Sequence, residues 1–233
     1  MTISVIYPSR GRPEIFKSTL KKWVDAARKP ENIEWIVSID QNDPCLSEYV
    51  SFYQNNDLHQ FFFLEISRNR SAIDAINNGA LRATNELFVV ISDDFLPFEN
   101  WDYALLGELQ YKEDFIVKTV DGLQPTLMTL PIMDRKYYER CIYSGYNYIY
   151  FPEYDHMFCD QEMTAVGHML GKVITLDLTF EHAHYTTGKF KKDAVSVRND
   201  STWAQGENLF NERLKTNFGI AEPVIPYSAI KWN

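Results

Sequence analysis

The sequence lacks several features that would point to whole classes of protein. No apolar run approaches the ~18 residues that a membrane-spanning helix needs. The N-terminus has neither the basic region nor the apolar core of a signal peptide. The three cysteines, Cys45, Cys141 and Cys159, are odd in number and lack the spacing of a metal site. These absences predict a cytoplasmic protein whose thiols stay reduced.

Basic residues are also in the minority, since 23 Lys and Arg stand against 32 Asp and Glu, for a net charge of −9. A protein that coats duplex nucleic acid usually has a basic face, and this composition gives no global sign of one. Aromatic residues, in contrast, are abundant, with 14 Tyr, 15 Phe and 5 Trp. That abundance is typical of a well-packed domain with a binding cleft.

Strand-like and helix-like segments alternate through the first half of the chain. Short apolar runs predict strands, and these are residues 3–7, 35–39, 61–66 and 87–91. Apolar residues at helical spacing predict helices between them, and these are residues 14–28, 46–54 and 69–83. The alternation predicts an α/β fold in which helices cover both faces of a parallel sheet.

Polar residues follow the first two predicted strands, at the strand ends where open α/β sheets bind ligands. The first strand leads into four residues where a nucleotide or phosphate could dock, namely Pro8, Ser9, Arg10 and Arg12. The alternative for this segment is a solvated loop. Asp40 ends the second strand and could accept a hydrogen bond from a base or a ribose hydroxyl. It could equally hold the following turn through backbone hydrogen bonds.

Further charged residues precede and follow the fourth strand. Arg68 and Arg70 lie ahead of the helix at 69–83 and could neutralise a diphosphate. The run Leu87 to Ile91 stops at Ser92-Asp93-Asp94. Mg²⁺ or Mn²⁺ is commonly held by one or two carboxylates together with substrate phosphates, so the Asp pair is a candidate metal or donor site. The alternative is a polar strand exit in which an Asp caps the next turn.

The second half of the chain adds an acidic helix start and a histidine pair. Phe158-Cys159-Asp160-Gln161-Glu162 opens a predicted helix, and Asp160 would face a cleft from its N-terminus. His182 and His184 are two residues apart, so in a strand they face the same side. A lone His is more often structural, but two of them after a candidate acid site favour one as a metal ligand.

A basic loop and a final helix complete the pattern. Lys189, Lys191 and Lys192 could belong to a mobile loop that closes over phosphates, or to a solvated surface loop. Asn199-Asp200-Ser201 is predicted to cap a last helix that runs to about residue 217, with Trp203 facing inward.

Over residues 3–185 these motifs resemble the inverting family 2-like glycosyltransferases of GT-A fold. The matching segments are Ser4 to Arg10, Ser38-Ile39-Asp40, Asn69 to Asn85, the Asp-x-Asp-type motif Ser92-Asp93-Asp94, and Cys159-Asp160-Gln161-Glu162 with Gly171. The resemblance implies a GT-A domain over residues 1–190, with a mostly parallel, Rossmann-like sheet. Its nucleotide-binding half would span residues 1–95 and its acceptor half residues 96–190. A C-terminal helical extension, residues 191–233, would pack on it.

The resemblance also implies a reaction and a set of roles. A sugar would move from a nucleotide-diphosphate sugar, such as a UDP sugar, to an acceptor hydroxyl with inversion. Asp160 would be the general base, and Asp94 would bind Mn²⁺ or Mg²⁺ with His182 or His184. Asp93 would contact the ribose or the donor sugar.

Two departures from the family pattern keep alternatives open. Ser92 stands where the metal motif usually begins with an acid, and Cys159 replaces the Glu of a Glu-Asp pair. Glu162 is therefore an alternative base, and a catalytically inactive nucleotide- or sugar-binding module is an alternative protein. A nucleotidyltransferase is the nearest enzyme alternative, although its phosphate loop would be richer in Gly and basic residues. The acceptor could be a glycan, a lipid-linked sugar, a protein or a hydroxylated nucleic-acid base.

Overall fold

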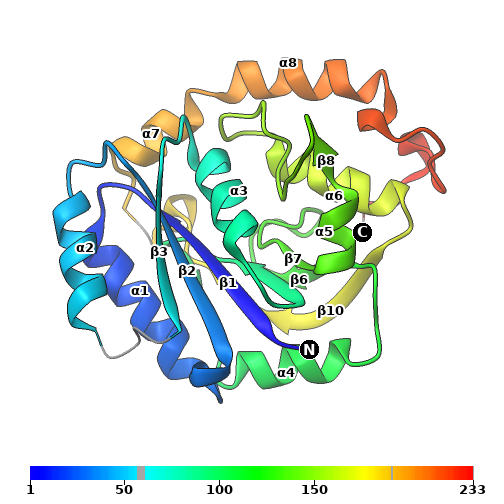
Figure 1. Cartoon of the computed structure of the whole chain (residues 1–233). Coiled ribbons are helices and arrows are strands. Elements are labelled where there is room, and N and C mark those ends of the chain that lie inside the picture. The colour runs from blue at the N-terminus through cyan, green and yellow to red at the C-terminus, as the bar shows by residue number, and fades with distance from the viewer. Residues whose placement is uncertain (57–60, 190, 233) are drawn as a thin grey trace.

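In a computed structural model that describes residues 1–56, 61–189 and 191–232, a seven-stranded sheet runs through the centre of the molecule (Figure 1). Its strands are β1 (Ile3–Ser9), β2 (Ile33–Asp40), β3 (Phe62–Ser67), β4 (Leu87–Val90), β6 (Ile116–Val120), β7 (Ile132–Asp134) and β10 (Val173–Thr179). They lie in the order β10-β6-β7-β4-β1-β2-β3. Two short ribbons pair β5 (Phe95–Leu96) with β11 (Glu181–His182), and β8 (Ile142–Tyr143) with β9 (Tyr146–Asn147).

Helices cover both faces of this sheet. They are α1 (Pro13–Ala26), α2 (Leu46–Asn55), α3 (Ala72–Arg82), α4 (Trp101–Leu109), α5 (Arg135–Arg140), α6 (Cys159–Met169), α7 (Ala194–Asp200) and α8 (Trp203–Leu214). Buried residues of α1, α2 and α4 form one apolar cluster with one face of the sheet. Those of α3, α5, α6 and α8 form a second cluster with the other face. Side chains alternate along β1 to fill both clusters, because Val5 enters the first and Ile6 the second.

The predicted mostly parallel sheet is confirmed. β1 pairs in parallel with β2 and β4, β2 with β3, and β6 with β10. β7 is the exception, since it runs antiparallel between β4 and β6. The sequence did not predict β7, because three residues are too few to show a strand period. The strand that leads to Asp93 and Asp94 therefore has one parallel and one antiparallel neighbour.

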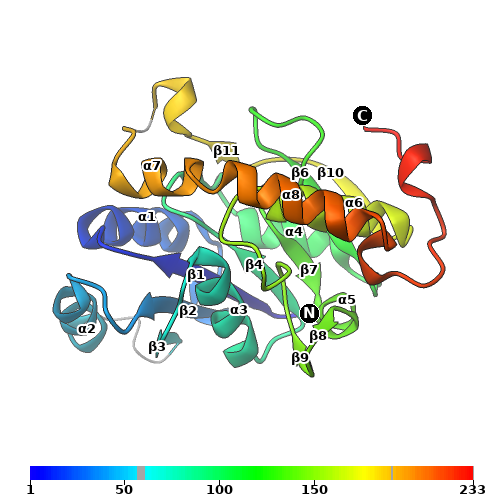
Figure 2. The ribbon, with the colours of Figure 1, turned by 90° about the horizontal axis from the view of Figure 1, so that it is seen from above.

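The predicted last helix is present as α8, but it begins at Trp203, and a further helix, α7, precedes it. Asp193 caps α7 by accepting a hydrogen bond from the Ser196 N–H, so the expected helix start at 199–201 is wrong. Residues 199 and 200 end α7 instead, and α8 begins at Trp203. Figures 1 and 2 show α8 lying across one edge of the molecule, beside α6. The predicted domain boundary at residue 190 lies outside the described residues.

Glu162 and Arg213 join α6 to α8. The Arg213 guanidinium donates to both carboxylate oxygens of Glu162, at 2.7 to 2.9 Å, and its carbon atom lies 3.2 Å from the Phe151 ring centroid. The Tyr154 hydroxyl donates a further hydrogen bond to the same carboxylate at 2.9 Å. Because this ion pair is buried and well satisfied, α8 is fixed to α6 rather than attached by a loose linker.

The start of α8 also touches the backbone that leads into α6. A β-carbon at Gly206 would lie 2.3 Å from the Met157 carbonyl oxygen, so no larger residue fits without movement. The Thr202 hydroxyl accepts a hydrogen bond from the Met157 N–H at 3.1 Å. The next residue, Phe158, has a φ of 72°, a left-handed conformation that a bulky residue adopts only when its surroundings hold it. Residues 202–206 supply those surroundings.

Gly206→Ala is expected to lower the free energy of unfolding by about 1–3 kcal/mol. The added methyl group would overlap backbone atoms, which cannot move aside as the end of a flexible side chain could. Urea denaturation measures the change. Gly107→Ala is the matched control, since Gly107 lies in α4 with open space where its β-carbon would be. That variant should be neutral or slightly stabilised, owing to the better helix propensity of Ala. Equal destabilisation of both variants would contradict the close packing at Gly206.

Candidate active site

A cleft of about 1120 Å³ lies where the central strands end. Its floor comes from the carboxyl ends of β1, β2 and β4, and its walls from the N-terminal turns of α3 and α6. Residues of α7 and of the start of α8, between Val195 and Gln205, line another side. The C-terminal helices are thus part of the site.

Most of the residues predicted for the site line this cleft. They are Pro8, Ser9, Arg10, Arg12, Asp40, Arg70, Asp93, Asp94, Asp160, His182 and His184. The other predicted residues do not line it, namely Arg68, Glu162, Lys189, Lys191 and Lys192. Segments from across the chain therefore converge, as the strand-end argument predicts, while the basic loop stays outside.

The Asp93 carboxylate is held on both oxygens by protein groups. The Tyr7 hydroxyl donates to Oδ1 at 2.6 Å, and the Arg12 guanidinium donates to Oδ2 at 3.0 Å. Burial raises the pKa of Asp93, although these two hydrogen bonds oppose the rise. Arg12 also donates to both carboxylate oxygens of Asp193, at 2.5 and 2.7 Å. Asp93 thereby ties the β4 end to the β1 end and, through Arg12, to α7.

Asp94 lies between a serine and a histidine. The Ser92 hydroxyl donates to Oδ1 at 2.6 Å, and His182 Nε2 lies 3.3 Å from Oδ2. Burial alone would raise the pKa of Asp94, but its contacts with His182 and Ser92 prevail and lower it to about 2. The residue that departs from the family motif, Ser92, therefore supports the carboxylate that follows it.

Asp121 completes this group and was missed by the sequence analysis. Its Oδ2 lies 3.5 Å from Nδ1 of His182, on the other side of the ring from Asp94. Backbone N–H groups of Leu123 and Gln124 hold its second oxygen at 2.7 to 2.8 Å. Burial lowers the pKa of His182, yet the two carboxylates outweigh it and raise the value to about 9. Asp121 directly follows β6, so the strand-end argument used for Asp40 could have found it.

Asp94 and His182 could supply two of the ligands of one divalent cation. Among the described residues, no group of three or more His, Cys, Asp or Glu side chains could hold a metal ion. Two adjacent ligands of an octahedral ion at ~2.1 Å lie about 3.0 Å apart, close to the observed 3.3 Å. The pair therefore fits an ion that takes its other ligands from substrate phosphates and water. Asp121 lies where an outer partner would orient the ring.

His184 is placed less favourably for the same ion. Its Nδ1 lies 2.9 Å from the Thr186 hydroxyl, and its ring centroid lies 5.2 Å from that of His182. The two imidazoles do share one side of the chain, as their spacing predicted. Of the two, His182 is the one in contact with Asp94.

Asp160 presents a carboxylate to the cleft from the first turn of α6. Its Oδ1 accepts a hydrogen bond from the Gln161 backbone N–H at 2.9 Å. Burial raises the pKa of Asp160, and this hydrogen bond opposes the rise in part. Glu162 differs, because Arg213 and Tyr154 occupy its carboxylate away from the cleft. The geometry thus separates the two candidate bases, and Asp160 is the one in reach of a bound molecule.

Several of the predicted phosphate-binding cations already have acidic partners. Arg10 forms an ion pair with Asp40 and also donates to Asn42 at 3.0 Å. Arg70 pairs with Asp74 at 2.8 Å. Among the lysines outside the cleft, Lys189 pairs with Glu181 at 2.7 Å and Lys192 with Asp200 at 2.6 Å, while Lys191 and Arg68 are exposed.

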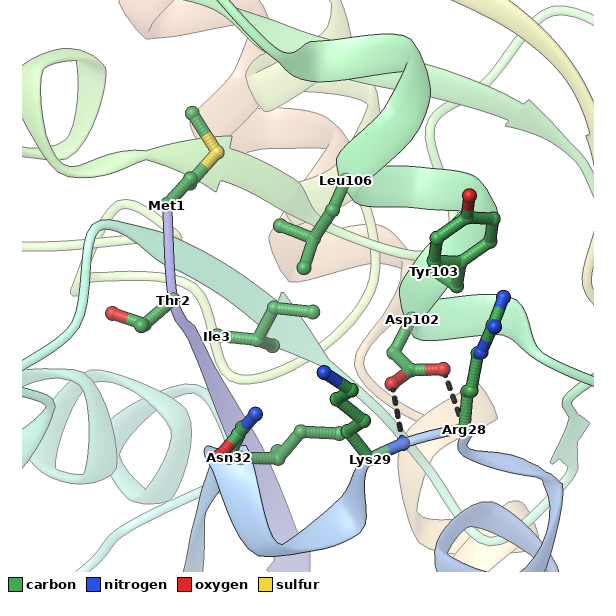
Figure 3. Close-up of a pocket in the computed structure, with 10 residues that line it drawn as sticks. Met1, Thr2, Ile3, Arg28, Lys29, Asn32, Asp102, Tyr103 and Leu106 are labelled. Atoms are coloured by element: carbon green, nitrogen blue, oxygen red, sulfur yellow. Dashed lines mark hydrogen bonds between the residues drawn. The ribbon is translucent and has the colours of Figure 1, made fainter.

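A second pocket, of about 540 Å³, lies near the chain start between β1 and α4 (Figure 3). Asp102 is its acidic residue. The Asp102 carboxylate accepts the backbone N–H groups of Arg28 and Lys29, at 2.7 and 3.0 Å. Because both oxygens are satisfied by backbone, Asp102 has a structural role here, anchoring the end of α1 to α4.

The family model described as Glycosyl transferase family 2 matches residues 4–171. The chain belongs to this family. It is a glycosyltransferase, and the predicted family resemblance is confirmed. No curated protein sequence matches the chain.

Solved structures of glycosyltransferases share its fold. The mannosyltransferase PcManGT from Pyrobaculum calidifontis, in complex with GDP-Man and Mn2+, is 13% identical with a TM-score of 0.61, over 98% of this chain and 77% of that one. S. aureus TarS 1-349 in complex with UDP-GlcNAc is 14% identical with a TM-score of 0.59, over 84% of this chain and 61% of that one. The GT-A fold predicted for this glycosyltransferase is thereby confirmed.

None of the helices in the described part of this glycosyltransferase has both the length and the apolar character that crossing a bilayer requires. The three cysteines are unpaired. Cys159 is buried at the start of α6, and Cys45 and Cys141 are half-buried.

Proposed function

We propose that this glycosyltransferase moves a sugar from a nucleoside-diphosphate sugar to an acceptor hydroxyl with inversion. Asp160 is the general base, and Asp94 with His182 holds Mn²⁺ or Mg²⁺. One observation carries the proposal: a single cleft is lined both by the Asp94–His182 pair and by Asp160, whose carboxylate accepts hydrogen bonds from backbone N–H groups within the described part of the chain.

The position and pKa of Asp160 suit the proton transfer. An acceptor hydroxyl is a weak nucleophile until a base takes its proton. The raised pKa of Asp160 makes its carboxylate a stronger base than that of an exposed aspartate. As the oxygen bonds to the anomeric carbon, the bond from that carbon to the diphosphate breaks, which inverts the configuration.

The leaving diphosphate needs its growing negative charge to be stabilised. A divalent ion on Asp94 and His182 would supply Lewis-acid stabilisation there. The chain's own contribution is to fix these ligands: Ser92 holds one oxygen of Asp94, and Asp121 faces the far nitrogen of His182. Arg12, anchored by Asp93 and Asp193, keeps a cation on the same wall of the cleft.

The similar structures support the donor class and the metal. PcManGT is described in complex with GDP-Man and Mn2+, and TarS in complex with UDP-GlcNAc. We propose the same class of donor for this chain, with UDP sugars tested first and GDP sugars second. Asp40 and the ends of β1 and β2 form the part of the cleft nearest to the expected nucleoside.

The test is to incubate the purified protein with UDP-GlcNAc, UDP-glucose and GDP-mannose, with and without Mn²⁺, and to identify the nucleotide released. Release of the nucleoside diphosphate above the buffer rate supports the proposal. Release of pyrophosphate would instead identify a nucleotidyltransferase. Absence of both products, together with a nucleotide-dependent increase in Tm, would identify an inactive binding module.

The metal assignment predicts that metal binding and proton binding compete. The two carboxylates raise the pKa of His182 to about 9 from its ordinary 6.5, so between these pH values the folded protein holds a proton that a metal must displace. Binding of Mn²⁺ at pH 7.5 should therefore release about one proton, and affinity should rise as the pH approaches 9. Calorimetry in buffers of different ionisation enthalpy measures the release.

His168→Gln is the matched control for this measurement, because His168 packs against Trp232 outside the cleft. It should release as many protons as the wild type, whereas His182→Gln should release fewer and bind Mn²⁺ more weakly. Mn²⁺ binding that is independent of pH would exclude His182 as a ligand.

A further inference from the structure

Two buried polar atoms at and just before the start of α6 have no hydrogen-bond partner within the described part of the chain. They are Nδ1 of His156 and Oε1 of Gln161, and both residues line the cleft. A buried polar atom without a partner destabilises the folded state, so such atoms usually receive a hydrogen bond from water or a ligand. Gln161 directly follows the proposed base, and the two unpaired atoms together favour a hydroxyl-bearing ligand in this part of the cleft.

Trp203 provides an apolar surface in the same cleft. Its side chain is 50% exposed, although the sequence pattern predicted that it faces inward. The Trp203 and Phe158 rings meet edge to face at 5.0 Å between centroids, so Phe158 restricts the orientation of the indole. A large aromatic side chain held rigidly and half-exposed in a cleft is a suitable stacking platform for a ring-shaped ligand.

The charges around this platform disfavour an anionic ligand. Asp155 and Asp200 line the cleft together with Asp160. The neighbouring cations already have acceptors, because Arg70 pairs with Asp74 and Arg198 donates to the Arg70 carbonyl oxygen at 2.7 Å. A nucleic acid or a phosphorylated acceptor would need cations free to bind its phosphates. A neutral ligand with hydroxyl groups and an apolar ring face fits better.

We propose that the acceptor is a neutral saccharide and that Trp203, His156 and Gln161 form its binding site. The transfer step in this inference rests on the proposed function, whereas the binding of the saccharide does not. The C–H face of a pyranose ring packs on the indole, while hydroxyl groups donate to Gln161 Oε1 and bind His156 Nδ1. The reacting hydroxyl gives its proton to Asp160, and its oxygen bonds to the anomeric carbon as the diphosphate leaves.

The test measures saccharide binding directly, without turnover. The probes are the methyl α- and β-glycosides of glucose, galactose, mannose and N-acetylglucosamine, each added to the protein alone and with UDP and Mn²⁺. Trp23, Trp35 and Trp101 are fully buried, so acrylamide does not reach them. In a Trp232→Phe protein the fluorescence that acrylamide quenches therefore comes from Trp203. At least one glycoside should protect this fluorescence from quenching.

Variants then assign the binding residues by titration of the protecting glycoside in saturation-transfer NMR. Trp203→Ala should weaken its binding about tenfold, and Trp203→Tyr should restore most of the loss, because the tyrosine ring keeps an aromatic surface for stacking. Gln161→Leu, which keeps the size but removes the oxygen, should weaken binding too. Trp232→Phe is the control that keeps wild-type affinity, since Trp232 packs on Tyr227 away from the cleft.

Three results would overturn the proposal: protection by none of the glycosides in either condition, wild-type affinity in Trp203→Ala, or protection by a single-stranded oligonucleotide in place of every glycoside. The last result would identify a nucleic-acid acceptor. Failure of the proposed reaction is a separate outcome, because it leaves nucleoside diphosphate unreleased whether or not a glycoside binds.

Discussion

Asp160→Asn is expected to lower turnover by about 10²- to 10⁴-fold, the usual contribution of a positioned general base, while nucleotide affinity stays nearly unchanged. Asparagine keeps the size of the side chain and its hydrogen bond to the Gln161 N–H, but it cannot take a proton. The rate of nucleoside diphosphate release measures turnover. Calorimetry with UDP and Mn²⁺ measures affinity.

Glu162→Gln is the matched control for that variant. Glu162 lies two residues further along α6, and its carboxylate is bound by Arg213 and Tyr154. Loss of its charge leaves Arg213 without its buried counterion, so this variant should unfold at a lower urea concentration. Its folded fraction should keep its turnover. The opposite result would be a loss of turnover in Glu162→Gln and normal turnover in Asp160→Asn. Glu162 would then be the general base in place of Asp160.

Asp94→Ala is expected to abolish metal-dependent nucleotide binding. Loss of an outer partner of a metal ligand typically costs 10- to 100-fold in metal affinity. Loss of Asp94, one of two side chains placed to hold the ion, should cost more than about 100-fold. Calorimetric titration of UDP into the protein, with and without Mn²⁺, measures the effect. The variant should bind UDP with the same weak affinity in both conditions.

The neighbouring carboxylate serves as the comparison. Asp93 is held by Tyr7 and Arg12, so Asp93→Asn should weaken the packing of the strand ends but leave some Mn²⁺-dependent binding. A titration in which Asp94→Ala still responds to Mn²⁺ as the wild type does, while Asp93→Asn does not, would move the metal to Asp93.

The sequence located the strand-end residues well, and the reason is geometric. Asp40, Asp93 and Asp94 lie directly after apolar runs, and the carboxyl ends of parallel strands meet at one edge of the sheet. Convergence of these residues therefore follows from the strand assignments alone. Asp121 follows the same rule, because it comes directly after the short strand β6. It was missed because no function was assigned to the end of that strand.

Other features depend on contacts that no local pattern contains. Glu162 and Asp160 are equally acidic in sequence, and the contacts of Glu162 with Tyr154 and with Arg213, 51 residues later, distinguish the two carboxylates. The lysines at 189–192 carry the charge that a phosphate loop needs, yet Glu181 and Asp200 pair with two of them outside the cleft. Trp203 follows the apolar spacing of α8 but stays half-exposed, because the helix begins at the edge of the cleft.

The ion pair between Arg12 and Asp193 has a consequence for the order in which this protein matures. These residues are separated by 181 positions, so the contact cannot form until Asp193 has left the ribosome. Until then Arg12 lacks the partner on α7 that fixes it against Asp93. A nascent chain that lacks α7 would therefore have the strands of the donor site but not the wall that α7 completes, and nucleotide-sugar use would begin only after α7 has been made.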